Sequence, residues 1–266
     1  MRRRRIPAPT ARKSAPDYSL QSLERGIDIL YALAEHPALS VEELSRVLRC
    51  PKSTTYRSLG ILRRKELVDR DPATARYRLG LGILRVERAV LRNLPVRTAA
   101  LPLVRELAAR SGETVVLTLR RGDFGVAVES IESSEPVRVA PAPGESMPLH
   151  CGAPMKAILA FSPEADIRQY LGRKLQRLTP RTICDSQKLK RHLAEIRAKG
   201  YAESWEEVYV GAVGVAAPIL GFEGFAIASL AVSGPIQRMT PQRVATLAPM
   251  LMDAAKDVSR RLQLSR

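Results

Sequence analysis

The sequence has few cysteines and histidines and lacks long apolar runs. Its 266 residues include Cys50, Cys151 and Cys184, which are odd in number and far apart. This spacing suggests neither a disulfide framework nor a metal site, and it fits the reducing cytoplasm. No apolar stretch reaches transmembrane length, and none follows the arginines at residues 2–5. We therefore expect neither a membrane span nor a secretory signal peptide.

Motifs of common enzyme classes are also missing: the sequence has no G-x-S-x-G, Walker loop or G-x-G-x-x-G. His150 and Cys151 are adjacent, and neighbouring side chains of an extended segment point to opposite faces. We expect them not to meet and to be buried structural residues. His192 stands alone in a helix that packing explains, and Glu206 beside Glu207 suits no facing acid–base pair. We therefore predict no enzymatic activity, catalytic residue, metal or cofactor.

Acidic residues are scarce relative to basic ones. The chain has 43 Lys and Arg against 27 Asp and Glu, a net charge of +16. Residues 1–80 hold 17 of the basic residues and 9 of the acidic ones, so the first third is the more densely basic part. Such an excess favours an anionic partner, either nucleic acid or an acidic membrane surface. Residues 1–19 predict a disordered basic tail, which either reinforces phosphate binding or is simply solvated.

Helix signals follow this tail. Apolar residues at helical intervals predict a helix over 22–35, with Ser22 as its N-cap. A second helix opens at the capping box formed by Ser40 and Glu43. After a short break, Pro51 suits the first position of a third helix. Two helices joined by a tight turn are typical of a helix-turn-helix.

The third helix divides by face. Thr55, Leu59 and Leu62 form a stripe that packs on the preceding helices. Small, hydroxylated and cationic residues fall on the opposite side: Ser53, Arg57, Gly60 and Arg64. Two strands within residues 67–79 then predict a wing.

A helix of this kind fits the major groove of B-DNA, where its first turn contacts base edges and its cations and hydroxyls hold phosphates. Arg57 is the best candidate for a guanine contact, and Lys52 for a phosphate. The predicted DNA-binding residues are Lys52, Ser53, Thr54, Tyr56, Arg57, Arg64, Arg76 and Arg78.

The rest of the chain predicts an amphipathic linker helix, which also suits contact with a partner subunit, and then an α+β domain with a largely antiparallel sheet. The linker helix covers 81–94. Further helices are expected at 101–110, 153–161, 164–171, 185–200 and 241–262, and strands at 113–119, 124–131, 206–220 and 225–232. Residues 137–152 are rich in Pro and Gly and are typical of a loop.

Three separated motifs resemble the IclR family of bacterial transcriptional regulators. "SVEELSRVLRCPKSTTYRSLGIL" is similar to the family's helix-turn-helix, "PGESMPLHCGAPMKAILA" to its loop-and-helix motif, and "GYAESWEEVYVGAVGVAAPI" with "ASLAVSGPIQRMT" to its C-terminal signature. The resemblance implies a winged helix-turn-helix domain at 20–82. It also implies a linker helix with a GAF-like effector-binding and oligomerisation domain at 83–266. Dimers or tetramers would read paired DNA sites in response to a small metabolite.

Motif alignment with the family also implies the effector-binding positions, which are Val139, Ala153, Pro154, Ser204, Ala212, Gly214, Ala231 and Ser233. Ser204, Gly214 and Ala231 stand where family members that bind small carboxylic acids carry an acidic residue, a cysteine and a serine. Met155 replaces the usual glycine before Lys156. These departures suggest a bulkier or less polar ligand, such as an aromatic acid, unless the positions merely repack.

The residues and the resemblance together predict a cytoplasmic, homo-oligomeric transcription factor that binds a palindromic operator in double-stranded DNA and responds to a metabolite. Two alternatives stay open. One is an architectural protein that binds nucleic acid without sequence preference, through charge alone. The other is a small-molecule enzyme with an accessory DNA-binding module, which would depend on His150 or Cys151.

Overall fold

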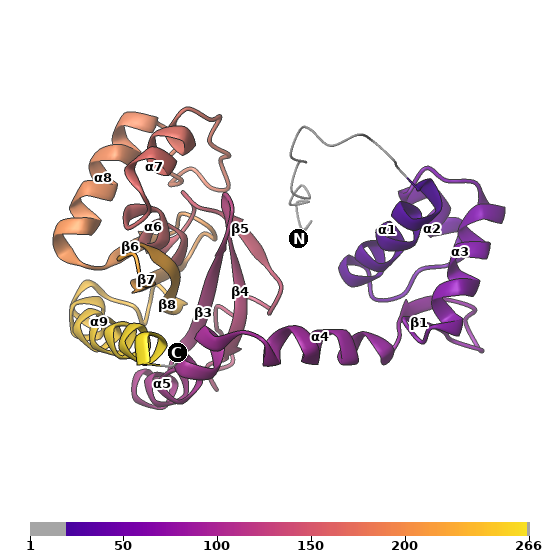
Figure 1. Ribbon diagram of the computed structural model, residues 1–266, viewed down its shortest axis with the longest axis horizontal. Helices are drawn as coiled ribbons and strands as arrows, with labels where there is room; N and C mark the ends of the chain where they lie inside the picture. Colours follow the sequence, from indigo (N-terminus) through magenta and orange to yellow (C-terminus); the bar gives the residue numbers. More distant parts are fainter. Residues whose placement is uncertain (1–19, 265–266) are drawn as a thin grey trace. The chain divides into compact units, whose positions relative to one another are not determined.

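In the computed structural model, residues 20–264 are described. The chain divides into two compact units, one ending at Val90 and the other beginning at Leu91. Helix α4 (Gly82–Arg92) crosses this division (Figure 1). The predicted basic tail, residues 1–19, lies outside the described residues. The predicted boundary between residues 82 and 83 stays a prediction.

The first unit is a winged helix-turn-helix, as the sequence predicts. Its elements, within the described residues, are α1 (Gln21–Glu35), α2 (Val41–Val47), α3 (Lys52–Arg64), β1 (Val68–Arg70) and β2 (Tyr77–Leu79). The two strands pair antiparallel, with Val68 opposite Leu79. Apolar side chains from the helices and the wing share one core, which includes Ile29, Leu33, Leu44, Leu59 and Val68.

Capping explains where these helices begin. Ser40 accepts a hydrogen bond from the Glu43 N–H, and the Glu43 carboxylate accepts one from the Ser40 N–H, so the predicted capping box is confirmed. The prediction for Ser22 is wrong, because α1 begins one residue earlier with Leu20 at the N-cap. Pro51 is the N-cap of α3 rather than its first residue, since its ψ of 139° is extended.

The second unit is built on one antiparallel sheet within residues 91–264, which confirms the predicted α+β class. The strand order is β5-β4-β3-β8-β7-β6. The strands are β3 (Thr114–Arg121), β4 (Phe124–Ile131), β5 (Ser146–Pro148), β6 (Ala202–Trp205), β7 (Ala212–Leu220) and β8 (Ala226–Pro235). The helices are α5 (Pro95–Ser111), α6 (Ala153–Ala160), α7 (Glu164–Leu171), α8 (Ser186–Lys199) and α9 (Pro241–Leu264).

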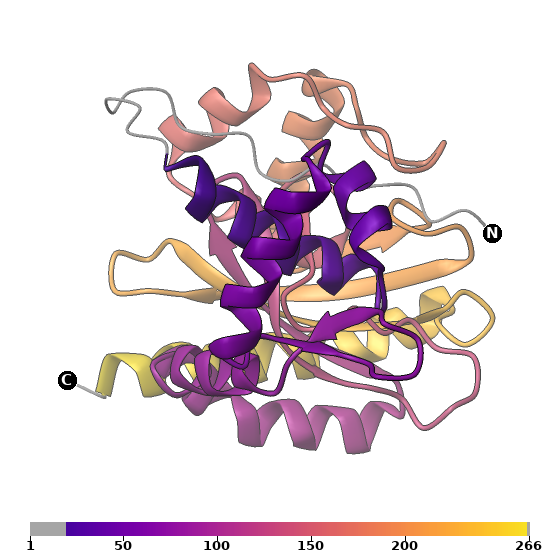
Figure 2. The same cartoon turned by 90° about the vertical axis from the view of Figure 1, so that its right-hand side faces the viewer.

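Helices cover both faces of this sheet (Figures 1 and 2). The side chains of β8 alternate between the two faces. Leu230 and Val232 pack with α5 and α9, whereas Ala231 packs in the cluster of α6, α7 and α8. The side chains between α6 and the sheet include the small residues Ala157 and Ala216. We infer that these small residues bring α6 close to the sheet and place its first turn over the middle strands.

Three boundaries differ from the predictions. Helix α5 begins at Pro95 instead of residue 101, because Val96 and Ala100 are buried in the core beneath the sheet. Residues 206–211 form a turn, with Glu206 at φ 59°, so the strand expected from residue 206 is replaced by β6 and β7 on either side. Within the predicted loop 137–152, β5 adds an edge strand to the sheet. No described helix is both long and apolar enough to span a bilayer.

Candidate DNA-contact face and effector cavity

The first turn of α3 is firmly anchored. The Pro51 carbonyl accepts hydrogen bonds from the N–H groups of Thr54 and Thr55, both at 3.0 Å, and from the Thr55 hydroxyl at 3.2 Å. Thr55, Leu59 and Leu62 are buried, and α3 packs on α1 and α2. The opposite side of the helix therefore faces away from the core of this unit.

This outward side of α3 carries most of the residues predicted to bind DNA. The exposed ones are Lys52, Ser53, Tyr56, Arg57 and Arg64. Thr54 is half-buried. A Cβ added at Gly60 would meet no atom within 4 Å, so this position is open. Ile61 is 52% exposed and follows Arg57 by one turn, and it was not among the residues predicted from the sequence. The sequence feature that could have indicated Ile61 is that it is apolar but lies outside the buried stripe of Thr55, Leu59 and Leu62.

The cations on this side differ in their pairing. Lys52 Nζ lies 3.2 Å from the Glu42 carboxylate of α2, and both side chains are more than half exposed. Within residues 20–264, no carboxylate lies within ion-pair distance of Arg57 or Arg64. Their guanidinium groups are therefore available to an anionic partner. Arg70, at the end of β1, is a further exposed cation that was not predicted.

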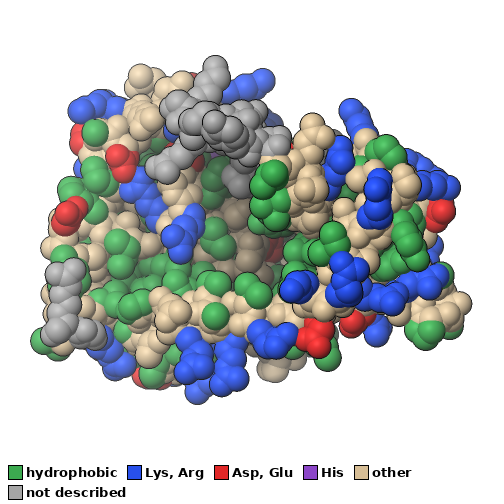
Figure 3. Space-filling view, turned by 45° about the vertical axis from the view of Figure 1, so that its right-hand side comes forward, with side chains coloured by type: hydrophobic (Ala, Val, Ile, Leu, Met, Phe, Trp, Pro, Cys, Tyr) green, Lys and Arg blue, Asp and Glu red, His purple; other side chains and the backbone are tan. Residues whose placement is uncertain are grey.

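The two wing arginines have different surroundings. The Arg76 guanidinium donates hydrogen bonds to the Ala38 carbonyl at 2.9 Å and to the Glu43 carboxylate at 3.1 Å. It thus ties the wing to the start of α2. Arg78 is exposed. On the face shown in Figure 3, Lys and Arg side chains clearly outnumber Asp and Glu over this unit.

The second unit contains a hollow of about 680 Å³, a volume that includes its open mouth. Seven of the eight predicted effector positions line it: Val139, Ala153, Pro154, Ser204, Ala212, Gly214 and Ser233. They come from the loop before β5, the first turn of α6, and the strands β6, β7 and β8. The fold therefore brings distant motifs to one cavity.

Ala231 is the exception. It pairs with Val116 of β3 and Ala216 of β7, and it is fully buried in the cluster around α6. Ser233 lies two residues further along β8, on the same side of the strand, and lines the cavity. Ala231 therefore lies on the same face of β8 as Ser233 but does not line the cavity.

The cavity wall is mainly apolar. Its polar side chains include the hydroxyls of Thr118, Ser204 and Ser233. At the wall, the Tyr209 hydroxyl lies 2.9 Å from the Glu145 carboxylate, which joins two loops. The described residues that line the cavity include no Lys, Arg or His. A ligand here would meet apolar surface, hydroxyl groups and the Glu145 carboxylate rather than a fixed cation.

Met155 shapes one side of the cavity. A Cβ at Gly125 would lie 3.0 Å from the Met155 Cγ, and a Cβ at Gly152 would lie 3.5 Å from its terminal methyl group. The thioether therefore fills the space that two glycines leave open. Gly125, Thr118 and Tyr209 were not predicted from the sequence, because β-strand pairing and loop contacts bring them to the wall.

His150 and Cys151 do meet, contrary to the prediction. They lie in a turn rather than an extended segment, and Cys151 Sγ is 3.4 Å from His150 Nε2. Burial raises the pKa of Cys151 to about 12 and lowers the pKa of His150. Both groups are therefore neutral near pH 7. The His150 ring joins the Tyr170 hydroxyl and the Gln176 carbonyl, each at 2.8 Å, so it serves as a structural link.

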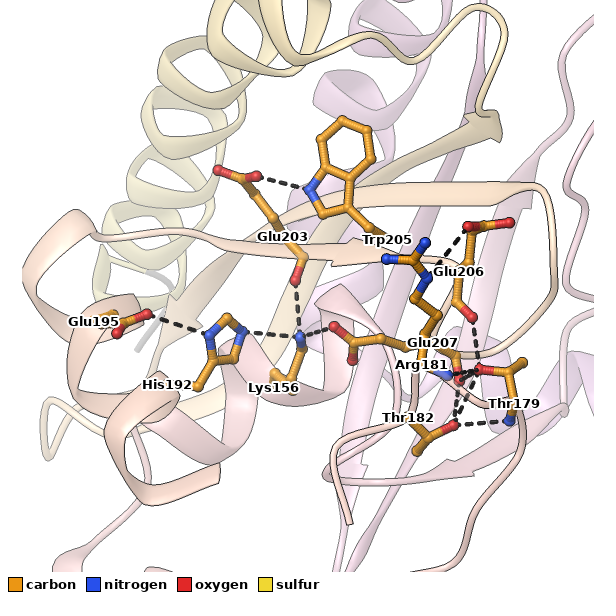
Figure 4. Close-up of polar contacts among 10 residues, drawn as sticks. All are labelled: Lys156, Thr179, Arg181, Thr182, His192, Glu195, Glu203, Trp205, Glu206 and Glu207. Carbon is orange, nitrogen blue, oxygen red and sulfur yellow. Dashed lines mark hydrogen bonds and ion pairs between the residues drawn. The ribbon is translucent and has the colours of Figure 1, made fainter. Parts of the chain in front are cut away.

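Lys156 of α6 is completely buried, and its side chain joins a polar cluster (Figure 4). It forms an ion pair with Glu207, donates to the Glu203 carbonyl at 2.9 Å, and lies 3.0 Å from His192 Nε2. Burial lowers the pKa of Lys156, and Glu207 opposes that shift. The prediction that His192 stands alone is therefore wrong. No group of His, Cys, Asp and Glu in the described residues could hold a metal ion.

Comparison with known protein families accounts for both units. Residues 22–72 match the IclR helix-turn-helix domain, and residues 88–260 match the C-terminal domain of bacterial transcriptional regulators of the IclR type. The chain belongs to the IclR family. It is therefore a DNA-binding transcriptional regulator with an effector-binding C-terminal domain, and a small metabolite modulates its operator binding.

Individual relatives span nearly the whole chain. The HTH-type transcriptional repressor AllR of Escherichia coli K12 is 34% identical over 258 residues, which cover 96% of this chain and 93% of AllR. The Thermotoga maritima IclR structure is 30% identical, covers 92% and 99% of the two chains, and has a TM-score of 0.79. An IclR homolog of Microbacterium hydrocarbonoxydans, solved with 4-hydroxybenzoate, is 24% identical over 92% and 100%, with a TM-score of 0.79. This last likeness shows the fold alone.

Proposed function

We propose that the outward side of α3 contacts the operator, with Arg57 reading a guanine and Lys52 holding a phosphate. The observation that carries this proposal is the exposed Arg57 guanidinium, which has no carboxylate near it in the described chain. Its planar fork suits the two acceptors of a guanine edge. Lys52 would exchange Glu42 for a phosphate, and an exposed pair of this kind costs little to break. Arg78 supports the wing contact better than Arg76 does.

A sequence-selection assay with the purified full chain near physiological salt tests this assignment. We expect enrichment of a palindrome whose half-sites lie about one helical turn apart, because a symmetric dimer presents two α3 helices. Enrichment of no sequence, with binding that disappears as salt rises, would instead support the alternative of non-specific phosphate binding.

We further propose that the cavity binds an organic acid with an apolar body. An aromatic acid is the ligand class that we favour. The mainly apolar wall, with hydroxyls at Thr118, Ser204 and Ser233, supports this class. The first turn of α6 at Ala153 also lines the cavity, and a helix N-terminus favours a negative group. Gly214 leaves room that a larger side chain would occupy. The relative solved with 4-hydroxybenzoate agrees with this choice.

A thermal-shift titration of the full chain tests the ligand class. Benzoate and its hydroxylated forms are compared with two- and three-carbon oxo-acids at equal concentrations. A ligand that binds only the native state raises the melting temperature of its unit. We expect the aromatic acids to do so, and Gly214→Ala to weaken the shift, because its Cβ would lie 3.2 Å from the Ser233 hydroxyl. Stabilisation by the small oxo-acids alone would overturn the proposal.

We also propose that the chain acts as a homodimer or a larger homo-oligomer. Helix α1 exposes apolar side chains at helical intervals, with Leu23 at 61%, Ile27 at 44% and Tyr31 at 70%. Helix α4 exposes Val86 and Val90, four residues apart, in the same manner. Contiguous exposed apolar surface marks interaction sites. Sedimentation of the wild-type chain and of Tyr31→Glu tests this, and a monomeric wild-type chain at micromolar concentration would refute it.

We infer that the chain is a cytoplasmic repressor without enzymatic activity. Its curated relatives at 34% identity are named transcriptional repressors, which supports this inference. The neutral His150–Cys151 pair is unsuited to nucleophilic catalysis, because the thiolate is the reactive form. A reporter behind the selected operator should be expressed more strongly when the protein is removed. Loss of expression on removal would instead identify an activator.

A further inference from the structure

The excess of positive over negative charge in residues 81–266 comes from one segment. Residues 168–199 contain ten Lys and Arg but only two acidic residues, Asp185 and Glu195. The other residues between 81 and 266 contain 16 of each sign and are therefore balanced. The segment covers the end of α7, the following loop and α8. We call its exposed surface the α7–α8 basic face.

All ten cations of the α7–α8 basic face are exposed. Arg173 pairs with Asp123, Arg181 lies 3.6 Å from the Glu206 carboxylate, and Arg197 lies 3.5 Å from that of Glu164. For the others, no carboxylate of the described chain lies within ion-pair distance. These are Arg168, Lys174, Arg177, Lys188, Lys190, Arg191 and Lys199. Most of this charge is therefore not neutralised internally.

The same surface lacks apolar anchors. Among the described residues, no large hydrophobic side chain between 138 and 208 is exposed. Protein interfaces rely on buried aromatic and aliphatic anchors, and helices that bind membranes insert an apolar face. By contrast, the turn between β7 and β8 exposes Phe222 and Phe225. The α7–α8 basic face therefore fits a polyanion recognised through charge rather than a protein or a bilayer.

The face is also rigidly supported. Helices α7 and α8 lie side by side next to α6 (Figures 1 and 2). Ile167 and Tyr170 of α7, with Leu189 and Leu193 of α8, are buried in one cluster with α6. The cations thus project from a fixed base, so little backbone ordering would accompany the binding of a ligand.

We propose that the α7–α8 basic face is a second DNA-binding surface, which holds backbone phosphates without regard to sequence. The inference rests on the proposed function, because the double-stranded DNA that α3 binds is the polyanion at hand. Each phosphate neutralised by a cation releases counterions and steepens the salt dependence of binding. The C-terminal unit would thereby add affinity while α3 supplies specificity.

The test compares two full-length triple variants with the same loss of charge. One carries Arg168→Gln, Lys188→Gln and Arg191→Gln in the α7–α8 basic face. The matched control carries Arg105→Gln, Arg121→Gln and Lys256→Gln, three exposed cations of the same unit outside that face. Affinity for a 60-base-pair duplex with the selected operator is measured from low to moderate salt, and thermal melting checks that both variants fold.

We expect the first variant to lose about 0.9 of the logarithmic salt slope for each contact removed, about 2.7 for three. The control should keep the wild-type slope. Equal slopes in all three proteins, or equal losses in both variants, would overturn the proposal. The ratio of operator to random-duplex affinity is read from the same titrations. If the wild-type chain shows no operator preference, the proposed function fails. If the wild-type chain prefers the operator but all three proteins have the same salt slope, only the proposal of a second DNA-binding surface fails.

Discussion

Two helices, α3 and α6, direct their first turns toward the proposed ligands, but they treat their lysines in opposite ways. Lys52 begins α3 with its side chain 65% exposed, whereas Lys156 of α6 is completely buried. An exposed cation is free to exchange partners, so it can bind a polyanion at little cost to the fold. A buried cation must keep its partners, so it fixes the shape of a cavity that it does not line. Substitutions should therefore separate affinity from stability.

The largest expected effect is at Lys156. Lys156→Met should reduce the free energy of unfolding of the C-terminal unit by about 3–5 kcal/mol, because it leaves the buried Glu207 carboxylate without its cation. Denaturant unfolding of the full chain, followed by the fluorescence of Trp205 in this unit, measures the effect. Adding Glu207→Leu should restore most of the loss. A single variant that costs less than about 1 kcal/mol would mean that the pair does not support the fold.

The next effect concerns the arginines of the first unit. Arg57→Ala should weaken operator binding by about 1–3 kcal/mol and relax the base preference at one position, with unchanged melting. Arg76→Ala should instead lower the stability of this unit, because Arg76 joins the wing to the Ala38 carbonyl and Glu43. Binding titrations and melting curves of both variants separate the two roles. Unchanged base preference in Arg57→Ala would contradict its assignment.

Local sequence patterns could predict much of this molecule. The capping box at Ser40 and the stripe through Leu59 indicate the helix-turn-helix, because helical periodicity and capping are properties of neighbouring residues. Of the eight effector positions that the motif resemblance implies, seven line the cavity. The resemblance also implied the eighth position, Ala231, which does not line the cavity. Alternation along β8 predicts which face of the sheet a side chain occupies, but it does not predict how deeply α6 covers that side chain.

Contacts that depend on the three-dimensional arrangement could not be predicted in this way. The pairing of Arg76 with Glu43 spans 33 residues, and that of Lys156 with Glu207 spans 51. No short pattern encodes such partners. The meeting of His150 with Cys151 was missed for a different reason. The prediction assumed an extended backbone where the chain forms a turn.

A smaller effect should appear at Gly60, on the outward side of α3. Gly60→Ala should stabilise the first unit by up to about 1 kcal/mol, because alanine is the better helix former and its Cβ would meet no atom within 4 Å. If DNA approaches this side closely, the same methyl group should weaken operator binding. Melting and binding would then change in opposite directions. Stabilisation with undiminished affinity would show that DNA does not approach Gly60.

The smallest expected effect is the dependence of stability on pH that His192 contributes. Burial and the nearby Lys156 lower the pKa of His192, while Glu195 opposes this shift and Lys199 adds to it. At His192, the unfolded chain therefore binds more protons than the native one below about pH 6.5. The contribution of His192 to the free energy of unfolding thus falls as the pH drops from 7 toward the lowered pKa.

His192→Gln tests this sign, because its amide oxygen still accepts a hydrogen bond from Lys156 but does not titrate in this range. Between pH 7 and 5, the C-terminal unit of the wild-type chain should lose more unfolding free energy than that of the variant. In the first unit, hydrogen bonds lower the pKa values of Glu42, Glu43 and Asp71. The unfolding free energy of this unit should therefore begin to fall with acid only below about pH 4.5. Parallel pH profiles for wild type and His192→Gln would show that His192 remains equally protonated in the native and unfolded states, and that its contact with Lys156 leaves its titration unchanged.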